Sequence, residues 1–410
     1  MLVRVEERPT SRARGGTALE ANSDGKRDPS LGLNNRQAPA DLVETTMPPT
    51  KWIQPSGPRD ARVVVVGRDC GWEEMRDQRG FVGASGKLIW HPTRRTGAAD
   101  VAGLPRSACL VTNVVNTQPP HNDWSKHDLG DIQRGSREAL DLIAEHPRTL
   151  VVALGEQATA LCLHGDPHAR LVDSITNLRG YVFPDSACGA PVLVAVHPAF
   201  ILRNWHPWWA TFCWDWAKAS RIVAQGGYKA PQILWEVAQG ERLNGGGIAD
   251  LLSAECMAID IETSGTGCVA FAASADYALV FPGMPAPDHP HEQAIRLLLE
   301  SDVPKVFQNG QFDVTMMQRA GWRVNNWRDD TMLMWWALEP LLAGQKEDAR
   351  GKGKRRTEKG LRFLASLLTD FEHYKNYEFA HDEQQFELCA KDAMVTWAIW
   401  DELRHRLAAA

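Results

Sequence analysis

The sequence lacks the patterns that mark several protein classes. Its eight cysteines are scattered and form no CxxC pair, so neither a zinc site nor an iron–sulfur cluster is indicated. No apolar run is long enough to cross a membrane, and residues 1–7 contain no apolar secretory segment. We therefore expect a cytoplasmic protein with reduced thiols, no iron–sulfur cluster and no membrane partner.

An excess of positive charge is also missing. The formal net charge is −6, which argues against a histone-like protein that binds DNA mainly by charge. It does not exclude a nuclease, whose acidic residues are neutralised by metal ions. Tryptophan, in contrast, is abundant, and several tryptophans between residues 205 and 216 follow helical spacing. This spacing predicts a packed helix rather than a base-stacking surface.

The composition divides the chain into four parts. Residues 1–50 are rich in Arg, Gly, Asn, Ser and Pro without periodicity, which predicts a disordered tail. Over residues 51–225, short apolar runs alternate with helical patterns, which predicts a three-layer α/β/α domain with a mostly parallel sheet. Residues 226–249 have the composition of a linker, and residues 250–410 form a second α/β unit.

Acidic residues recur where metal chemistry needs them. Asp260 and Glu262 are two positions apart on a predicted strand, so their carboxylates share one face. Asp313 opens a helix after a turn that Asn309 can fix, and Asp392 lies on an amphipathic helix. Four carboxylates from three segments suit two hard divalent cations, Mg²⁺ or Mn²⁺.

The order and contexts of these segments carry a resemblance. Residues 258–264, 305–313 and 389–397 resemble the three exonuclease motifs of the DEDD superfamily. The form is that of the proofreading domains of DNA polymerase I-like enzymes, including phage ones. The resemblance implies a ribonuclease H-like fold with a mixed sheet and a 3′→5′ exonuclease that removes nucleotides from single-stranded DNA or 3′ ends.

The resemblance also implies residue roles. The carboxylates expected to be catalytic and to hold two cations are Asp260, Glu262, Asp313 and Asp392. Thr263 is expected to contact the terminal nucleotide, and Asn309 and Phe312 to shape the second motif. Nothing in the motifs reads the 2′-hydroxyl group, so RNA stays open as a substrate.

One position departs from this family pattern. The polymerase-type subgroup has a tyrosine four residues before the last Asp, where this chain has Leu388. Leucine cannot orient a water molecule, so we expect activity reduced by ~10²–10⁴-fold, unless Tyr374, Tyr377 or His381 supplies the missing group. On this reasoning, Leu388→Tyr is expected to raise the rate.

The chain ends soon after the third motif, and no polymerase sequence follows. We therefore expect a stand-alone exonuclease or the exonuclease half of a split polymerase, acting with a separate DNA polymerase. The setting would be phage-type DNA replication or repair, in the host cytoplasm if the protein is phage-encoded.

The first domain carries a second resemblance, to the uracil-DNA glycosylase superfamily and most closely to its family-4 type. The segments that carry it follow predicted strands, where α/β proteins place their sites: residues 67–74, 81–86, 112–120 and 197–199. The resemblance implies that Phe81 stacks on a flipped base and Asn113 reads its edge. His197 would stabilise charge on the departing base, and an acid, here Asp69, would activate water.

Several residues depart from the family-4 pattern. Arg68 stands where that family has the acid, with Asp69 one position later, and Cys70 replaces a proline. Thr117 stands where a cluster-binding cysteine is expected. We interpret the domain as a degenerate glycosylase that binds DNA or a partner; an active glycosylase and a structural remnant are the alternatives. For the whole chain, the alternative to an exonuclease is a replication accessory that binds DNA or a polymerase without cutting.

Overall fold

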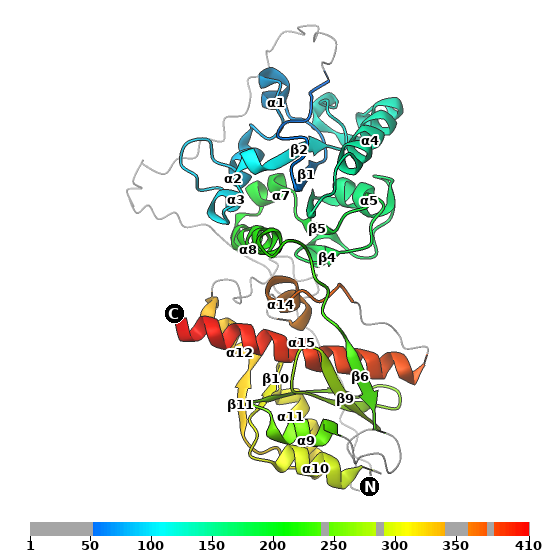
Figure 1. The fold of residues 1–410 in the computed structure, drawn as a ribbon, viewed down its shortest axis with the longest axis vertical. Helices are drawn as coiled ribbons and strands as arrows, with labels where there is room; N and C mark the ends of the chain where they lie inside the picture. Colours follow the sequence, from blue (N-terminus) through cyan, green and yellow to red (C-terminus); the bar gives the residue numbers. More distant parts are fainter. Residues whose placement is uncertain (1–51, 239–245, 284–290, 341–359, 375–380, 410) are drawn as a thin grey trace, which may run out of the picture. The chain divides into compact units, whose positions relative to one another are not determined.

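Two β-sheets organise the chain in the computed structural model, which describes residues 52–238, 246–283, 291–340, 360–374 and 381–409. The predicted tail at residues 1–50 and Tyr377 lie outside these described residues. Each sheet carries helices on both faces (Figure 1). No described helix combines the length and apolar character that a bilayer crossing requires.

The first sheet has the strand order β2-β1-β3-β5-β4. Its strands are β1 (Val63–Gly67), β2 (Cys109–Asn113), β3 (Leu150–Leu154), β4 (Val182–Phe183) and β5 (Val192–Ala195). All neighbouring strands are parallel except β4, which is antiparallel to β5. This arrangement confirms the predicted mostly parallel sheet.

The helices of this domain lie in two layers. Because strand side chains alternate between faces, Val63 and Val65 enter one core cluster, while Val64 and Val66 enter the other. The helices are α1 (Trp72–Asp77), α2 (Ala84–Ile89), α3 (Ala98–Val101), α4 (Leu129–Ala144), α5 (Glu156–His164), α6 (Ile175–Leu178), α7 (Pro198–Arg203) and α8 (Trp205–Ala224). Short 3-10 turns occur at Arg106–Ala108, Pro120–Asn122 and Trp124–Lys126.

The tryptophan-rich segment forms helix α8, as predicted. Trp216 is 1% exposed, and its ring lies 5.7 Å from that of Trp90 in an edge-to-face arrangement. Packing therefore accounts for this part of the helix, in agreement with the interpretation from spacing.

The second sheet is mixed and has the order β11-β10-β7-β8-β9-β6. Its strands are β6 (Leu234–Val237), β7 (Met257–Glu262), β8 (Cys268–Ala272), β9 (Tyr277–Pro282), β10 (Lys305–Phe307) and β11 (Trp327–Asp330). Strand β6 falls inside residues 226–249, for which the sequence predicts a linker, and pairs in parallel with β9. The strand has only four residues, which alternate between exposed and half-buried positions, and so short a run does not distinguish an edge strand from a linker.

Helices cover both faces of the second sheet (Figure 1). They are α9 (Gly246–Ser253), α10 (Glu292–Glu300), α11 (Gln311–Arg319), α12 (Thr331–Leu338), α14 (Leu361–Leu368) and α15 (Asp382–Ala409). Ala258 of β7 packs in the cluster that contains α15, whereas Ile259 packs against α10 and α11. Because Asp260 shares the face of Ala258, the strand directs this acid toward α15.

Candidate active sites

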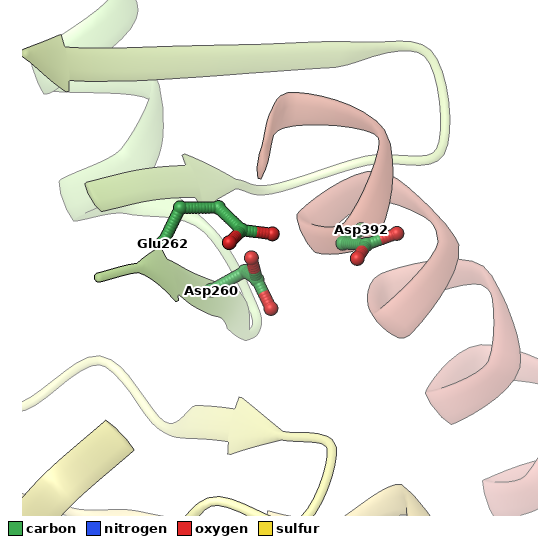
Figure 2. Close-up of side chains that lie close together, drawn as sticks. All are labelled: Asp260, Glu262 and Asp392. Carbon is green, nitrogen blue, oxygen red and sulfur yellow. The ribbon is translucent and has the colours of Figure 1, made fainter. Parts of the chain in front are cut away.

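Strand β7 and helix α15 bring three acidic side chains together. Asp260 and Glu262 leave the strand on the same side, and Asp392 of the helix lies close to them (Figure 2). One carboxylate oxygen from each residue lies within 4.8 Å of the other two. We call these three residues the acidic cluster.

Asp313 lies beside the acidic cluster without belonging to it. It sits in the first turn of α11 and is 7% exposed. Its negative charge helps to raise the pKa of Asp260, so the two carboxylates are near enough to interact. The structure thus brings three of the four expected acids into one close group, and the fourth, Asp313, acts on Asp260 through its charge.

The acidic side chains of this site repel one another. Burial, followed by the charges of Asp392, Asp313 and Glu262, raises the pKa of Asp260 well above its usual value. Burial is also the main cause that raises the pKa of Asp313 and of Asp392 to about 7. Packing like charges in a poorly solvated place costs free energy unless a cation or protons neutralise them.

The donor set fits a hard divalent cation. Oδ2 of Asp260 is buried, and no group in the described part of the chain donates a hydrogen bond to it. A buried carboxylate oxygen without a donor is costly, and oxygen ligands are what Mg²⁺ and Mn²⁺ prefer. The residues present therefore suit a metal ion at this position.

The second motif is a tight turn. Asn309 has a φ of 59°, a conformation that asparagine tolerates better than most residues, as the sequence predicts for this position. Asp330 accepts hydrogen bonds from the backbone N–H groups of Asn309 and Gly310, at 3.2 and 2.8 Å. No sequence pattern assigns this role to Asp330, because it lies twenty-one residues after Asn309 in the chain.

Residues expected to contact substrate are accessible. Phe312 is 51% exposed on α11. Thr263 is exposed just after strand β7. Both side chains are therefore available for a nucleic-acid end.

Leu388, at the position where a tyrosine is expected, lies in the core. Leu388 is 6% exposed and packs in the cluster beneath α15. Tyr374 instead reaches the site: its hydroxyl group donates to Oδ1 of Asp392 at 2.7 Å. His381 is exposed. Of the described residues proposed as substitutes, the structure brings Tyr374 to the acidic cluster.

A second candidate site lies in the first domain. A cavity of about 460 Å³ opens at the carboxyl ends of the strands. All four residues expected in a base pocket line it: Asp69, Phe81, Asn113 and His197. A cavity of this size, lined by aromatic and polar groups, can hold a small planar ligand.

The acid of this pocket is already paired. Oδ2 of Asp69 accepts a hydrogen bond from Nε of Arg68 at 2.9 Å. It also lies 3.4 Å from Nε2 of His127, close enough for an ion pair but without hydrogen-bond alignment. The sequence analysis missed His127, which has no motif around it. These two neighbours compete with a water molecule for the carboxylate.

The tautomer of His197 follows from its contacts. Nδ1 accepts a hydrogen bond from the backbone N–H of Ala199 at 3.1 Å, so the ring proton must lie on Nε2. Burial lowers the pKa of His197 to about 4, which keeps the ring neutral near pH 7. A neutral ring with a proton on Nε2 can donate a hydrogen bond to a base carbonyl.

Phe81 and Asn113 belong to the lining of the pocket. Both are buried, and Nδ2 of Asn113 donates to the sulfur of Cys70 at 3.3 Å. A Cβ atom at Gly67 would clash with the Phe81 ring and with Oδ1 of Asn113. The pocket therefore needs glycine at the end of β1 to keep its depth.

Comparison with known proteins agrees with this two-part organisation. Residues 54–218 match the uracil DNA glycosylase superfamily, and residues 247–408 match the 3'-5' exonuclease family. The chain is 29% identical over 158 residues to a type-4 uracil-DNA glycosylase of Sulfurisphaera tokodaii, covering 38% of this chain and 67% of the relative. It is 29% identical over 159 residues to that of Thermotoga maritima, covering 38% and 73%.

Among solved structures, the chain is similar to Brucella melitensis NrnC with bound Mg2+. The identity is 18%, the TM-score is 0.29, and the match covers 44% of this chain and 83% of NrnC. That score is too low to support a conclusion. The sequence matches are sufficient: a uracil-DNA glycosylase superfamily domain precedes a 3′-5′ exonuclease domain, and the former is family-4-like.

Proposed function

We propose that this chain, in which a glycosylase superfamily domain precedes a 3′-5′ exonuclease domain, is a metal-dependent enzyme. It would remove nucleotides from the 3′ ends of DNA. The observation that carries the proposal is the acidic cluster, in which Asp260, Glu262 and Asp392 place carboxylate oxygens within 4.8 Å of one another. Oδ2 of Asp260 has no hydrogen-bond donor in the described part of the chain. Carboxylates in this arrangement suit the binding of divalent cations.

Each acid has a role in this proposal. Asp260, Glu262, Asp313 and Asp392 would hold two cations, Mg²⁺ or Mn²⁺. Bound there, the cations would supply positive charge to the scissile phosphate and lower the pKa of a water molecule. Tyr374 donates to Asp392, which leaves the other lone pairs of that carboxylate free to act as ligands.

Substrate binding follows from the exposed residues. The ring of Phe312 can stack on a terminal base, and stacking tolerates every base. Thr263 can contact the terminal nucleotide through its hydroxyl or backbone group. Neither contact reads the 2′-position, so an RNA strand is the alternative substrate, and a matched RNA primer distinguishes the two.

The test is a 5′-labelled DNA primer incubated with the full-length protein and Mg²⁺ or Mn²⁺. We expect a ladder that shortens from the 3′ end and that EDTA abolishes. The same primer with a blocked 3′ end is the control. An intact primer in both metals would contradict the proposal and favour the alternative of a non-catalytic accessory that binds DNA or a polymerase.

For the first domain we propose DNA binding with weak or no base excision. The cavity beside Asp69, Phe81, Asn113 and His197 supports binding of a flipped base. The pairing of Asp69 with Arg68 supports weak excision, because excision needs a carboxylate available to water. An active glycosylase is the alternative, favoured by the same cavity.

The biological setting is also a proposal. Removal of 3′ nucleotides fits proofreading or repair in phage-type DNA replication, with a separate DNA polymerase as the partner and the cytoplasm as the location. A co-purification of the full-length protein with a replicative polymerase tests this partner. A polymerase whose misincorporation rate is unchanged by the protein would contradict a proofreading role.

A further inference from the structure

Side chains of the glycosylase-like domain form several hydrogen bonds and an ion pair with one segment of the exonuclease domain. This segment, residues 360–374, contains helix α14 and ends on Tyr374, and we call it the α14 segment. It lies with the glycosylase-like domain in one compact unit, residues 49–410. The residues that bond to it, which we call the clamp residues, are Arg179, Tyr181, Lys218, Arg221 and Tyr228.

Lys218 of helix α8 donates hydrogen bonds to carbonyl groups at the end of α14. Its side chain is buried, at 4% exposure. Its ammonium donates to three carbonyl oxygens: Gly180 at 2.7 Å, Ser366 at 2.5 Å and Thr369 at 2.7 Å. The last carbonyl groups of a helix have no partner within it and carry partial negative charge. The three hydrogen bonds of this buried side chain fix the end of α14 to α8.

Arg221 and Tyr228 hold the residues that follow α14. Two guanidinium nitrogens of Arg221 donate to the two carboxylate oxygens of Asp370, at 2.7 and 2.6 Å. The hydroxyl group of Tyr228 donates to the Asp370 carbonyl oxygen at 2.6 Å. A bidentate arginine–carboxylate pair restricts orientation as well as distance.

The other clamp residues hold α14 itself. Arg179 is buried in an ion pair with Asp215 and donates to the Ser366 hydroxyl group at 3.1 Å. Tyr181 donates to the Arg362 carbonyl oxygen at 2.7 Å. The segment is therefore fixed along its length, from Arg362 to Asp370.

The clamped segment delivers Tyr374 to the acidic cluster. Tyr374 follows Asp370 by four residues, and its hydroxyl group donates to Asp392 at 2.7 Å. Tyr374 also shares a core cluster with Tyr181 of the first domain. The position of a hydrogen-bond donor to an expected metal ligand thus depends on contacts made by the other domain.

We propose that the glycosylase-like domain is a positioning element of the exonuclease site. Its clamp residues hold the α14 segment so that Tyr374 orients the carboxylate of Asp392 for metal binding. Tyr374 is a positioning residue, because it acts through Asp392. The inference rests on the proposed function for the role of the acidic cluster, and it gives the first domain a part in cutting that needs no base excision.

The experiment measures Mn²⁺ affinity and 3′-end cutting for variants of the full-length protein. Loss of a hydrogen bond to a metal ligand costs about 10- to 100-fold in metal affinity or activity, which is the loss expected for Tyr374→Phe. For Arg221→Glu we expect about a 2- to 30-fold loss, the range of coupling through packed contacts. The reversed pair Arg221→Glu with Asp370→Arg should recover much of that loss. Arg296→Ala, which removes an ion pair with Glu292 on α10, is the matched control.

A stability effect alone would not give the expected pattern. If the clamp acts through Tyr374, Arg221→Glu adds little further loss in the Tyr374→Phe background. Hydrogen exchange should accelerate in the α14 segment, and the loss should appear in kcat rather than in the KM for DNA. Full additivity of the two substitutions, or faster exchange in the segment with unchanged Mn²⁺ affinity and kcat, would overturn the inference.

The two proposals fail in different ways. A wild-type protein that binds Mn²⁺ but does not shorten a primer contradicts the exonuclease proposal. The clamp proposal is then still tested by comparing the Mn²⁺ affinity of the wild type with that of the same variants. A wild-type protein that cuts, with an unchanged rate in both Tyr374→Phe and Arg221→Glu, contradicts the clamp alone. A wild-type protein that binds no Mn²⁺ contradicts both.

Discussion

Asp330 holds the turn at Asn309 with a single carboxylate that also begins the next helix. It accepts from the N–H groups of Asn309 and Gly310, and it caps α12 through the N–H groups of Met332 and Leu333. The residue is 7% exposed. One buried side chain therefore fixes both the turn before Asp313 and the start of the following helix.

Replacing this carboxylate should weaken fold and site together. Asp330→Ala leaves buried N–H groups without an acceptor, at a cost of about 1–3 kcal/mol in the free energy of unfolding. Chemical unfolding measures this loss, and the exposed Asp302→Ala is the control. We also expect slower cutting, because the turn that places Asp313 is released. A fully stable Asp330→Ala protein would show that water replaces the lost acceptor.

Removing a carboxylate of the proposed metal site should abolish cutting. Asp260→Ala or Asp313→Ala is expected to release at least one cation. DNA binding, measured by fluorescence anisotropy in EDTA, should remain largely intact because we propose that the substituted groups hold metal rather than DNA. An Asp260→Ala protein that digests the primer at the wild-type rate would contradict the site assignment.

Restoring the family tyrosine at residue 388 now has a different expected outcome. The sequence alone suggests a gain for Leu388→Tyr, but Leu388 is buried in the core, and Tyr374 already donates to Asp392. Overpacking a core costs about 1–3 kcal/mol. We therefore expect a lower melting temperature and no gain in rate. A faster enzyme of unchanged stability would restore the original expectation.

Metal binding should depend on pH. The folded pKa values of Asp313 and Asp392 are raised to about 7, above the unfolded value of about 3.9. The metal-free fold therefore holds more protons than the unfolded chain between these values, and its stability falls as pH rises through that window. Cations compete with the same protons. Titration calorimetry should show tighter Mn²⁺ binding at about pH 8 than at about pH 5.5, and equal affinities would contradict the shifts.

Uracil excision should be weak or absent. Asp69 is paired with Arg68, whose guanidinium stays charged and cannot act as a base. The assay is a uracil-containing oligonucleotide followed by alkali. Strong cleavage that disappears in Asp69→Asn would establish an active glycosylase instead. Phe81→Ala should still weaken single-strand binding by about 1–3 kcal/mol if the ring stacks on a base.

Local patterns predicted much of the fold and the acidic residues. Four consecutive valines from Val63 to Val66 indicated a strand buried on both faces, and the spacing of Asp260 and Glu262 placed both on one face of β7. Contacts between distant segments were not predictable in this way. Tyr374 precedes Asp392 by eighteen residues, and no periodic pattern connects the two. The pairing of Lys218 with Ser366 and Thr369 likewise depends on tertiary packing alone.

Strand β6 affects where an expressed fragment of the exonuclease domain should begin. A fragment that starts at residue 250 contains every acid of the cluster but omits β6, the neighbour of β9 in the sheet. The unpaired N–H and C=O groups of β9 would then be free to pair with a second fragment. Such a fragment should aggregate on expression, whereas one that begins before Leu234 should keep its edge strand and stay dispersed.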